Sequence, residues 1–413
     1  FDDRYLMDFS LRENGSSVFG ASKRYIGTWS VGLGWNLHKE RFIADHLTWI
    51  DFLKLRASIG NPGNQNFSSS KTLTTFNFQL ASMNYFGMGA VLNQLGNPDL
   101  DWQITLDKNI GIDMTLIDKR LNITADYYHK VTDPLLINIS MPLSSGTSSY
   151  LTNMGKQISQ GLTLSASYYI IQKLDQRFSW LVRGNLRTQK TKLDKIGNKL
   201  DELNKSGQGH NTVRYYNGAD PDDIWAVKSA GIDPSTGREL FYDKEGNYTY
   251  DFSYDNEVIC GNTRPKIEGV IGTSLNYKGF SVSMNFRYQT GASVFNEALF
   301  NKVENISVSG LNKNQDKRAL YDRWQKPGDI VKFKRIDDVS VTPMSSRFVA
   351  DDNTLECKSI SLGYETTQAT WLKSVGISSF SFRIYMNDIF RLSTIKDERG
   401  IDYPFQRAVS ASM

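Results

Sequence analysis

The chain has 413 residues, of which 39% are hydrophobic and 12% aromatic, and its formal net charge is +4. Such a small and dispersed positive charge gives no support for a nucleic-acid-binding protein. No run of about eighteen apolar residues occurs, which excludes a membrane-spanning helix but not a membrane barrel, because barrel strands are only half apolar. Two cysteines, Cys260 and Cys357, are too few to suggest a disulfide framework.

Stretches in which apolar and polar side chains alternate run through the sequence, and a period of two residues is typical of β-strands with one apolar face. In the fifth stretch, for example, Leu121 and Ile123 alternate with Asn122 and Thr124. The pattern predicts about twelve strands, each long enough for a tilted membrane crossing. In chain order they lie near residues 4–12, 24–37, 51–60, 104–117, 119–130, 155–171, 177–191, 265–278, 279–291, 354–366, 377–390 and 403–413.

Strand length and the polar faces favour a membrane barrel over a soluble sandwich. Sandwich strands have about five or six residues, whereas the predicted strands are roughly twice as long, as membrane crossings are. Charged side chains recur on the polar faces, where a barrel would have its water-filled lumen. These charged residues are Lys54, Arg56, Asp107, Asp113, Asp126, Arg183, Arg187, Arg287 and Arg383.

The connections between the predicted strands alternate in length, as do the short periplasmic turns and long external loops of outer-membrane barrels. If the first connection is external, every very long connection is external too: 61–101, 132–154, 192–264 and 292–353. The tightest turns, Asp118-Lys119 and Lys278-Gly279, then lie on the periplasmic side. The last strand runs inward, which predicts a periplasmic C-terminus. One surface helix is expected inside a loop, over residues 311–326.

Several segments also match one family of outer-membrane proteins, in the family's order. The most characteristic is GNPDLDWQITLDKNIGIDMTLIDKRLNITADYYHKVTDPLL (96–136), which PLSSGTSSYLTNMGKQISQGLTLSASY (142–168) continues. The match extends through TRPKIEGVIGTSLNYKGFSVSMNFRYQTGASVFN (263–296) and LECKSISLGYE (355–365). On these segments the chain resembles the late barrel of TonB-dependent receptors, and among them the SusC/RagA branch of Bacteroidetes. It departs from the family at Ser159–Thr163, where the family usually has Asn-Lys/Arg-Gly-aliphatic-Glu.

The resemblance implies an all-β fold, in which residues 1–413 form the C-terminal portion of a transmembrane antiparallel β-barrel. About twelve of about twenty-two strands would be present, without the plug domain and the earlier strands. It implies an outer-membrane importer of oligosaccharides or peptides that is energised by TonB. The implied partners are a SusD-like surface lipoprotein, TonB through the missing N-terminal region, outer-membrane lipid or lipopolysaccharide, and a glycan or peptide substrate.

Three other functions remain open at the level of sequence. The same architecture serves receptors for an iron chelate or cobalamin. A barrel of this kind can also be a structural component of a larger outer-membrane assembly. A soluble all-β adhesin, with its alternating faces packed in a sandwich, is the remaining alternative.

Two loop segments contain candidate residues for contact with a substrate or with the SusD-like lipoprotein, which by the resemblance covers the external loops as a lid. GNPGNQ (60–65) opens a long external loop; a structural turn is the preferred interpretation, with Asn64 and Gln65 as ligand candidates. The segment 213–256 is rich in aromatic residues, whose rings stack on sugars and peptides. Its hairpin turn is expected at residues 243–246, and Tyr215, Tyr216 and Trp225 are the binding candidates.

The sequence offers no catalytic, cofactor or metal motif. DPDD (220–223) has carboxylates but lacks the order of ligands of an EF-hand, so a solvated turn is favoured over a calcium site. The four histidines have no metal-ligand spacing, and no Ser-His-Asp, GxSxG or P-loop pattern occurs. The expectation is a protein that is not an enzyme and has no cofactor.

Overall fold

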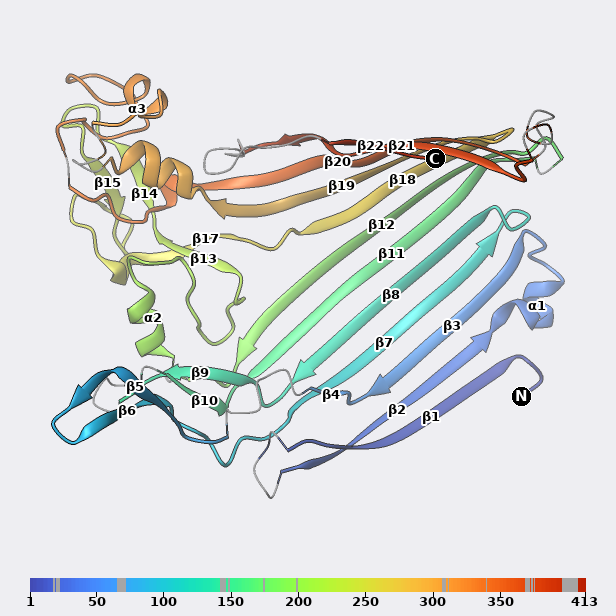
Figure 1. Cartoon of the computed structure of the whole chain (residues 1–413), viewed down its shortest axis with the longest axis horizontal. Coiled ribbons are helices and arrows are strands. Elements are labelled where there is room, and N and C mark those ends of the chain that lie inside the picture. Colours follow the sequence, from blue (N-terminus) through green and yellow to red (C-terminus); the bar gives the residue numbers. More distant parts are fainter. Residues whose placement is uncertain are drawn as a thin grey trace.

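The computed structural model describes the chain except for residues 18, 20–22, 65–71, 142–145, 148, 174, 198–199, 307–309, 311, 339, 368–371, 373, 375 and 396–407. Within the described residues, twelve strands lie side by side in one antiparallel sheet, in the order in which they follow along the chain (Figure 1). They are β1 (Tyr5–Gly15), β2 (Tyr25–Asn36), β3 (Ile50–Gly60), β7 (Gln103–Leu116), β8 (Leu121–Thr132), β11 (Lys156–Lys173), β12 (Phe178–Asp194), β18 (Ile267–Tyr277), β19 (Phe280–Phe295), β20 (Val349–Thr366), β21 (Phe380–Ser393) and β22 (Val409–Ser412).

The sheet is an open, curved wall, and this confirms the prediction of a partial barrel (Figure 1). Each predicted strand has its counterpart in this row; the first part of the twelfth predicted strand, residues 403–407, lies outside the described residues. No helix in the described part of the chain is long and apolar enough to cross a membrane.

The two ends of the wall differ, as the lengths of the connections predict. The very long connections 61–102, 133–155, 195–266 and 296–348 gather at one end, which we call the loop end (Figure 1). The tight turns lie at the opposite end, which we call the turn end, together with the connection 37–49 that contains α1 (Arg41–Ala44) (Figure 1). Small additional sheets form within the loops. They comprise β5 (Thr75–Asn84) with β6 (Gly87–Gln94), β9 (Leu136–Ser140) with β10 (Ser149–Asn153), β13 (Asp223–Val227) with β17 (Glu257–Asn262), and β14 (Ser229–Ile232) with β15 (Glu239–Tyr242) and β16 (Tyr248–Thr249).

Both predicted tight turns are present at the turn end. Lys278 and Gly279 connect β18 to β19 with φ angles of 48° and 96°, the left-handed combination that suits a two-residue hairpin. Residues 117–120 connect β7 to β8, and Asp118 and Lys119 have φ angles of 53° and 63°. The backbone amide of Lys119 is held by the Asp51 carboxylate at 2.9 Å.

Replacing Gly279 with alanine should destabilise the wall by about 1–3 kcal/mol, because a side chain at this φ is strained. A Cβ atom there would also lie 2.3 Å from the Glu365 carbonyl oxygen. Gly246 has a φ of +87° but no atom within 4 Å of its Cβ position, so Gly246→Ala is the matched control. Chemical unfolding of the two variants measures the difference, and an equal loss in both would contradict the proposed clash.

The two faces of the wall follow the alternation in the sequence. Asp113, Thr124 and Arg56 lie on the polar face, where the Arg56 guanidinium contacts Asp113 at 2.6 Å and Asp126 at 3.0 Å. On the other, apolar face, the register places Ile112 beside Ala125, and Ala125 beside Leu164. A one-residue shift in register would exchange these faces, so the ion pairs on the polar face support the observed register.

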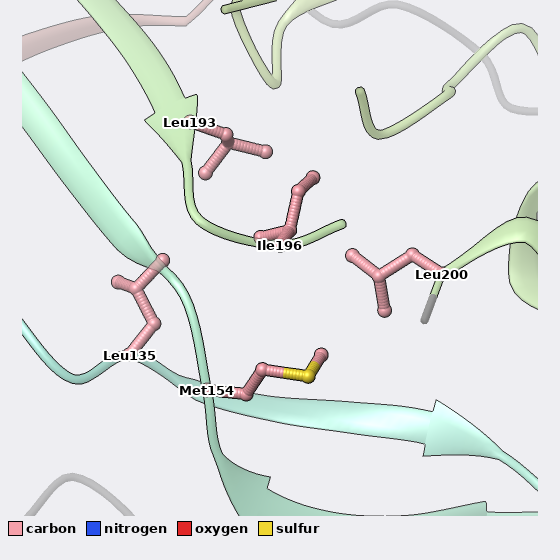
Figure 2. Close-up of a cluster of buried hydrophobic side chains, with 5 residues drawn as sticks. All are labelled: Leu135, Met154, Leu193, Ile196 and Leu200. Atoms are coloured by element: carbon pink, nitrogen blue, oxygen red, sulfur yellow. The ribbon is translucent and has the colours of Figure 1, made fainter. Parts of the chain in front are cut away.

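Most of the buried hydrophobic residues lie at the loop end, because a single-layered wall has no second layer against which to pack. The exceptions are Leu53, Leu116 and Leu372 at the turn end and Cys357 within β20. One cluster joins the ends of β8 and β12 to β10 and the helix α2 (Asp201–Gly207) (Figure 2). Its buried members are Leu135, Met154, Leu193, Ile196 and Leu200. The loops are therefore folded onto the wall as packed structures.

The surface helix expected over residues 311–326 is much shorter in the structure. Helix α3 covers only Arg318–Tyr321. The chain leaves the helical path after it because Arg323 forms a parallel bridge with Phe333, and the amide of Trp324 donates to the Phe333 carbonyl at 3.1 Å. The expectation of a longer helix was wrong, since a tertiary contact overrides the local preference.

Candidate functional site at the loop end

The loop between β12 and β18, residues 195–266, begins as an extension of the wall. The Leu193 amide donates to the Ala219 carbonyl at 2.9 Å, and the Gly218 amide donates to the Leu193 carbonyl at 2.7 Å. Arg264, at the other end of the loop, donates to the Thr191 hydroxyl at 2.7 Å and contacts Asp220 at 3.2 Å. These bonds anchor both ends of the loop to the end of β12.

The three aromatic candidates of this loop differ in the residues against which they pack. Tyr215 is partly buried and packs against the cluster of Figure 2, and its backbone exchanges hydrogen bonds with the Asn204 side chain. Tyr216 is 39% exposed. Its ring centroid lies 4.8 Å from that of Trp225, which is in β13. The structure thus pairs Tyr216 with Trp225 and separates Tyr215 from them as a packing residue.

The two polar groups of the Tyr216–Trp225 pair differ, because the Tyr216 hydroxyl can donate a hydrogen bond whereas the Trp225 indole nitrogen is buried. Burial, and then the negative charge of Glu257, raise the pKa of Tyr216, so its hydroxyl is protonated at neutral pH and can donate. The Trp225 indole nitrogen is buried and has no hydrogen-bond partner among the described residues. The pair offers a partly exposed aromatic surface with a hydroxyl donor, that of Tyr216.

A buried ion pair connects the segment that carries Tyr216 to β17. Arg214, the residue before Tyr215, is 1% exposed and contacts the Glu257 carboxylate of β17 at 2.7 Å and 2.9 Å. Its guanidinium also donates to the carbonyls of Asn211 and Val213. Sequence analysis missed Arg214, and a charged residue next to two tyrosines was the only signal that could have revealed it.

A second ion-pair network connects this loop to the loop between β19 and β20, residues 296–348. Arg347 contacts Glu239 of β15 at 2.8 Å and Glu304, at the end of a π-helix (Leu299–Glu304), at 2.6 Å. Ser345 and Thr342 donate to the same two carboxylates. Burial works against the charge of Arg347, but the two carboxylates raise its pKa above the ordinary value. The ion pair between Arg347 and Glu239 therefore holds the two longest loops together.

The acidic segment 220–223 is more than a solvated turn. Asp220 and Asp222 both form ion pairs with Arg264, and Asp223 accepts a hydrogen bond from Asn262 at 2.8 Å. The predicted turn is present, since the Asp223 amide donates to the Asp220 carbonyl at 3.1 Å. Its carboxylates are not simply solvated, because Arg264, from the other end of the loop, pairs with two of them. In the described part of the chain, no three His, Cys, Asp or Glu side chains are grouped to hold a metal ion.

The hairpin expected near residues 243–246 is confirmed. Residues 243–247 form the turn between β15 and β16, where the Asp243 amide donates to the Asn247 carbonyl at 3.0 Å. A hydrogen bond from the Tyr250 hydroxyl, followed by bonds from Ser235 and Thr236, lowers the pKa of Asp233 well below its ordinary value. Asp233 is thus an ionised acceptor that holds this part of the loop together.

Of the other two candidate residues, only Asn64 is among the described residues. Asn64 is in the short strand β4 (Gly63–Asn64), which pairs with the start of β7. Gln65 lies outside the described residues. The role of both residues remains a prediction.

A wide antiparallel wall with a polar face, folded loops at one end and tight turns at the other defines the class of outer-membrane β-barrels. A family model described as TonB dependent receptor-like, beta-barrel matches residues 1–298. The chain belongs to this family.

Its relatives point to the SusC/RagA-like transporters within the family. It is 27% identical to TonB-dependent receptor P39 of Formosa agariphila, over 94% of this chain and 41% of that protein. It is 26% identical to TonB-dependent receptor SusC of Bacteroides thetaiotaomicron, over 99% of this chain and 41% of that protein. A solved structure of the RagAB peptide transporter has the same fold, with a TM-score of 0.83 and 22% identity over 96% of this chain and 43% of that one. The chain therefore spans less than half the length of these relatives.

Proposed function

We propose that this chain is the C-terminal portion of the barrel of an outer-membrane importer for oligosaccharides or peptides. The complete protein would add the plug domain and the remaining strands, and TonB would supply the energy. It would be a transporter and not an enzyme. The observation that carries the proposal is the arrangement at the loop end, where long folded loops hold an aromatic pair and an ion-pair network above a polar wall.

The orientation and the partner are part of the same proposal. The loop end faces the outside of the cell, and the turn end and the C-terminus face the periplasm. A SusD-like surface lipoprotein covers the loop end, and Tyr216 and Trp225 contact the substrate or this lipoprotein. Support for this proposal comes from the similarity in fold to the RagAB peptide transporter and from the similarity to SusC.

Purification of the full-length receptor from outer membranes, followed by uptake assays, tests the proposal. We expect a lipoprotein to co-purify in stoichiometric amounts, and cells to take up labelled oligosaccharides or oligopeptides only when TonB is intact. Uptake of a ferric chelate or cobalamin in their place would establish the alternative receptor function. An intact assembly without uptake of any of these compounds would instead indicate a structural component.

Replacing Tyr216 and Trp225 with alanine should weaken substrate or lid binding by about tenfold, since an aromatic contact contributes about 0.5–1.5 kcal/mol beyond its buried area. Tyr216→Phe retains the ring and isolates the contribution of the hydroxyl. Tyr321, an exposed aromatic residue in the other long loop, provides the control Tyr321→Ala. Isothermal titration of the full-length complex measures the affinity, and equal affinities of the double variant and the control would refute the assignment.

A further inference from the structure

Two pockets open on the polar face of the wall, the face that would line the lumen of the complete barrel. The first has a volume of about 520 Å³ and lies on β1, β2, β3 and β7, towards the loop end. The second has a volume of about 440 Å³ and lies on β8, β11, β12 and β18, towards the turn end. Arg12 is among the residues that line the first pocket, and Arg183 is among those that line the second.

Glycine residues make room at both pockets. Gly60, the first residue of the GNPGNQ segment, lines the first pocket and lies beside Ser30 in the register. A Cβ atom at this position would lie 2.9 Å from the Ser30 Cβ atom, so the floor of the pocket depends on the missing side chain. Beside the second pocket, Gly272 lies opposite Arg183 in the register. The guanidinium therefore reaches across β18 and donates to the Asn285 side chain of β19 at 3.2 Å.

Most carboxylates of the polar face are neutralised within the wall, but the arginines of the two pockets are not. The ion pairs join Asp113 and Asp126 to Arg56, Asp107 to Lys130, Glu268 to Arg187 and Arg287, and Asp352 and Glu356 to Arg391. Asp8 has no such partner among the described residues, and it lines neither pocket. Arg12 and Arg183 are exposed, and no described carboxylate lies within ion-pair distance of either. Each pocket thus contains a positive charge without a counter-charge.

Hydroxyl and amide side chains accompany the arginine in each pocket. They include Ser30, Ser58 and Asn109 in the first pocket and Asn122, Ser167 and Asn185 in the second. Such groups form hydrogen bonds with the hydroxyls of a sugar, and a guanidinium without a counter-charge binds a carboxylate through two parallel hydrogen bonds. An acidic sugar unit would use both kinds of group, whereas an acidic peptide side chain would use only the arginine.

We propose that the lumen of this importer selects acidic oligosaccharides, and that Arg12 and Arg183 are two successive binding sites for their carboxylates. Asn109 of the first pocket lies opposite Tyr128 of β8, and Asn122 of the second pocket precedes Tyr128 by six residues. At a rise of about 3.3 Å per residue, the two sites are about 20 Å apart along the strand. Charged side chains that line a pore select cargo of the opposite charge. The inference rests on the proposed function, in which an oligosaccharide crosses the lumen from the loop end to the turn end.

Isothermal titration of the full-length receptor with tetragalacturonate tests the two sites, and the neutral tetramer of galactose is the matched ligand. Arg12→Gln together with Arg183→Gln should weaken the binding of tetragalacturonate by about tenfold or more, because the substitutions remove charge-assisted pairs of hydrogen bonds. Binding of the neutral tetramer should be unchanged. Arg383→Gln is the control, because Arg383 is another exposed cation of the polar face but lines neither pocket. It should bind both tetramers like the wild type.

Four results would overturn the inference. They are a wild-type receptor without preference for the acidic tetramer, an equal loss of affinity in the double variant and the control, displacement of the tetramer by millimolar acetate, and equally tight binding of pentaglutamate through the same arginines. Hydrogen exchange without ligand tests whether the plug domain pairs with these arginines in place of the cargo. Loss of plug protection in the double variant would assign Arg12 and Arg183 to the plug and refute the cargo sites.

The uptake assays separate this inference from the proposed function. If cells take up neutral oligosaccharides or peptides through the receptor and the arginine variants bind like the wild type, only the selection of acidic cargo fails. If the receptor takes up no oligosaccharide and no peptide, the proposed function fails as well.

Discussion

Replacing Arg347 with methionine should destabilise the loop end by about 3–5 kcal/mol, the largest effect that we expect from a single substitution. The Glu304 side chain is fully buried and that of Glu239 is 7% exposed, so both carboxylates would lose their cation while remaining in a low-dielectric environment. Hydrogen exchange of the β15 amides in the full-length receptor measures the local opening. The wall strands should keep their protection, because none of the three residues belongs to the membrane-crossing part of a strand.

Two further variants separate this network from a general effect of losing an arginine. Arg335 pairs with Asp337 on the surface, where both side chains are largely exposed, so Arg335→Ala should cost no more than about 1 kcal/mol. Adding Glu239→Gln and Glu304→Gln to Arg347→Met should recover much of the loss by removing the unpaired charges. If Arg347→Met and Arg335→Ala lowered the hydrogen-exchange protection of the β15 amides equally, the buried ion pairs would not be what holds the two loops together.

Replacing Ile123 with arginine should destabilise the barrel by about 2–4 kcal/mol, because a charge would be placed on the lipid-facing surface near the middle of the membrane. Ile123 lies between Met114 and Ala166 in the register, and all three side chains belong to the apolar face. Equilibrium unfolding of the full-length receptor in lipid vesicles measures the cost.

The neighbouring residue provides the matched control. Thr124 lies between Asp113 and Ser165 on the polar face, so Thr124→Arg places the same side chain toward water and two nearby carboxylates. We expect little change in stability from this substitution. Similar losses at positions 123 and 124 would contradict the assignment of the apolar face to lipid.

Much of the wall could be predicted from sequence because each strand is encoded locally. The alternation in Leu121–Thr132 predicts which side chains share a face of the wall. The difference in length between the Lys278-Gly279 turn and the 195–266 connection predicts at which end of the wall each connection lies. Neither feature depends on a contact between distant residues, so both could be predicted from the sequence, and both are present in the structure.

The candidate site was less accessible to the same reasoning. Tyr215 and Tyr216 are adjacent and chemically identical in the sequence, yet one packs on the cluster of Figure 2 and the other on Trp225. The composition of the loop identified an aromatic region but could not assign these roles. They depend on Asn204, whose side chain fixes the backbone of Tyr215 from helix α2.

The sequence by itself determined the strands, their two faces, the order of long and short connections and the family to which the chain belongs, because all of these follow from the spacing of residues along the chain. Only the tertiary structure decided that Arg347 joins two loops and that Arg264 pairs with two carboxylates of the acidic segment at 220–223. These ion pairs join side chains from distant segments of the chain, and no local sequence pattern predicts which cation will pair with which carboxylate.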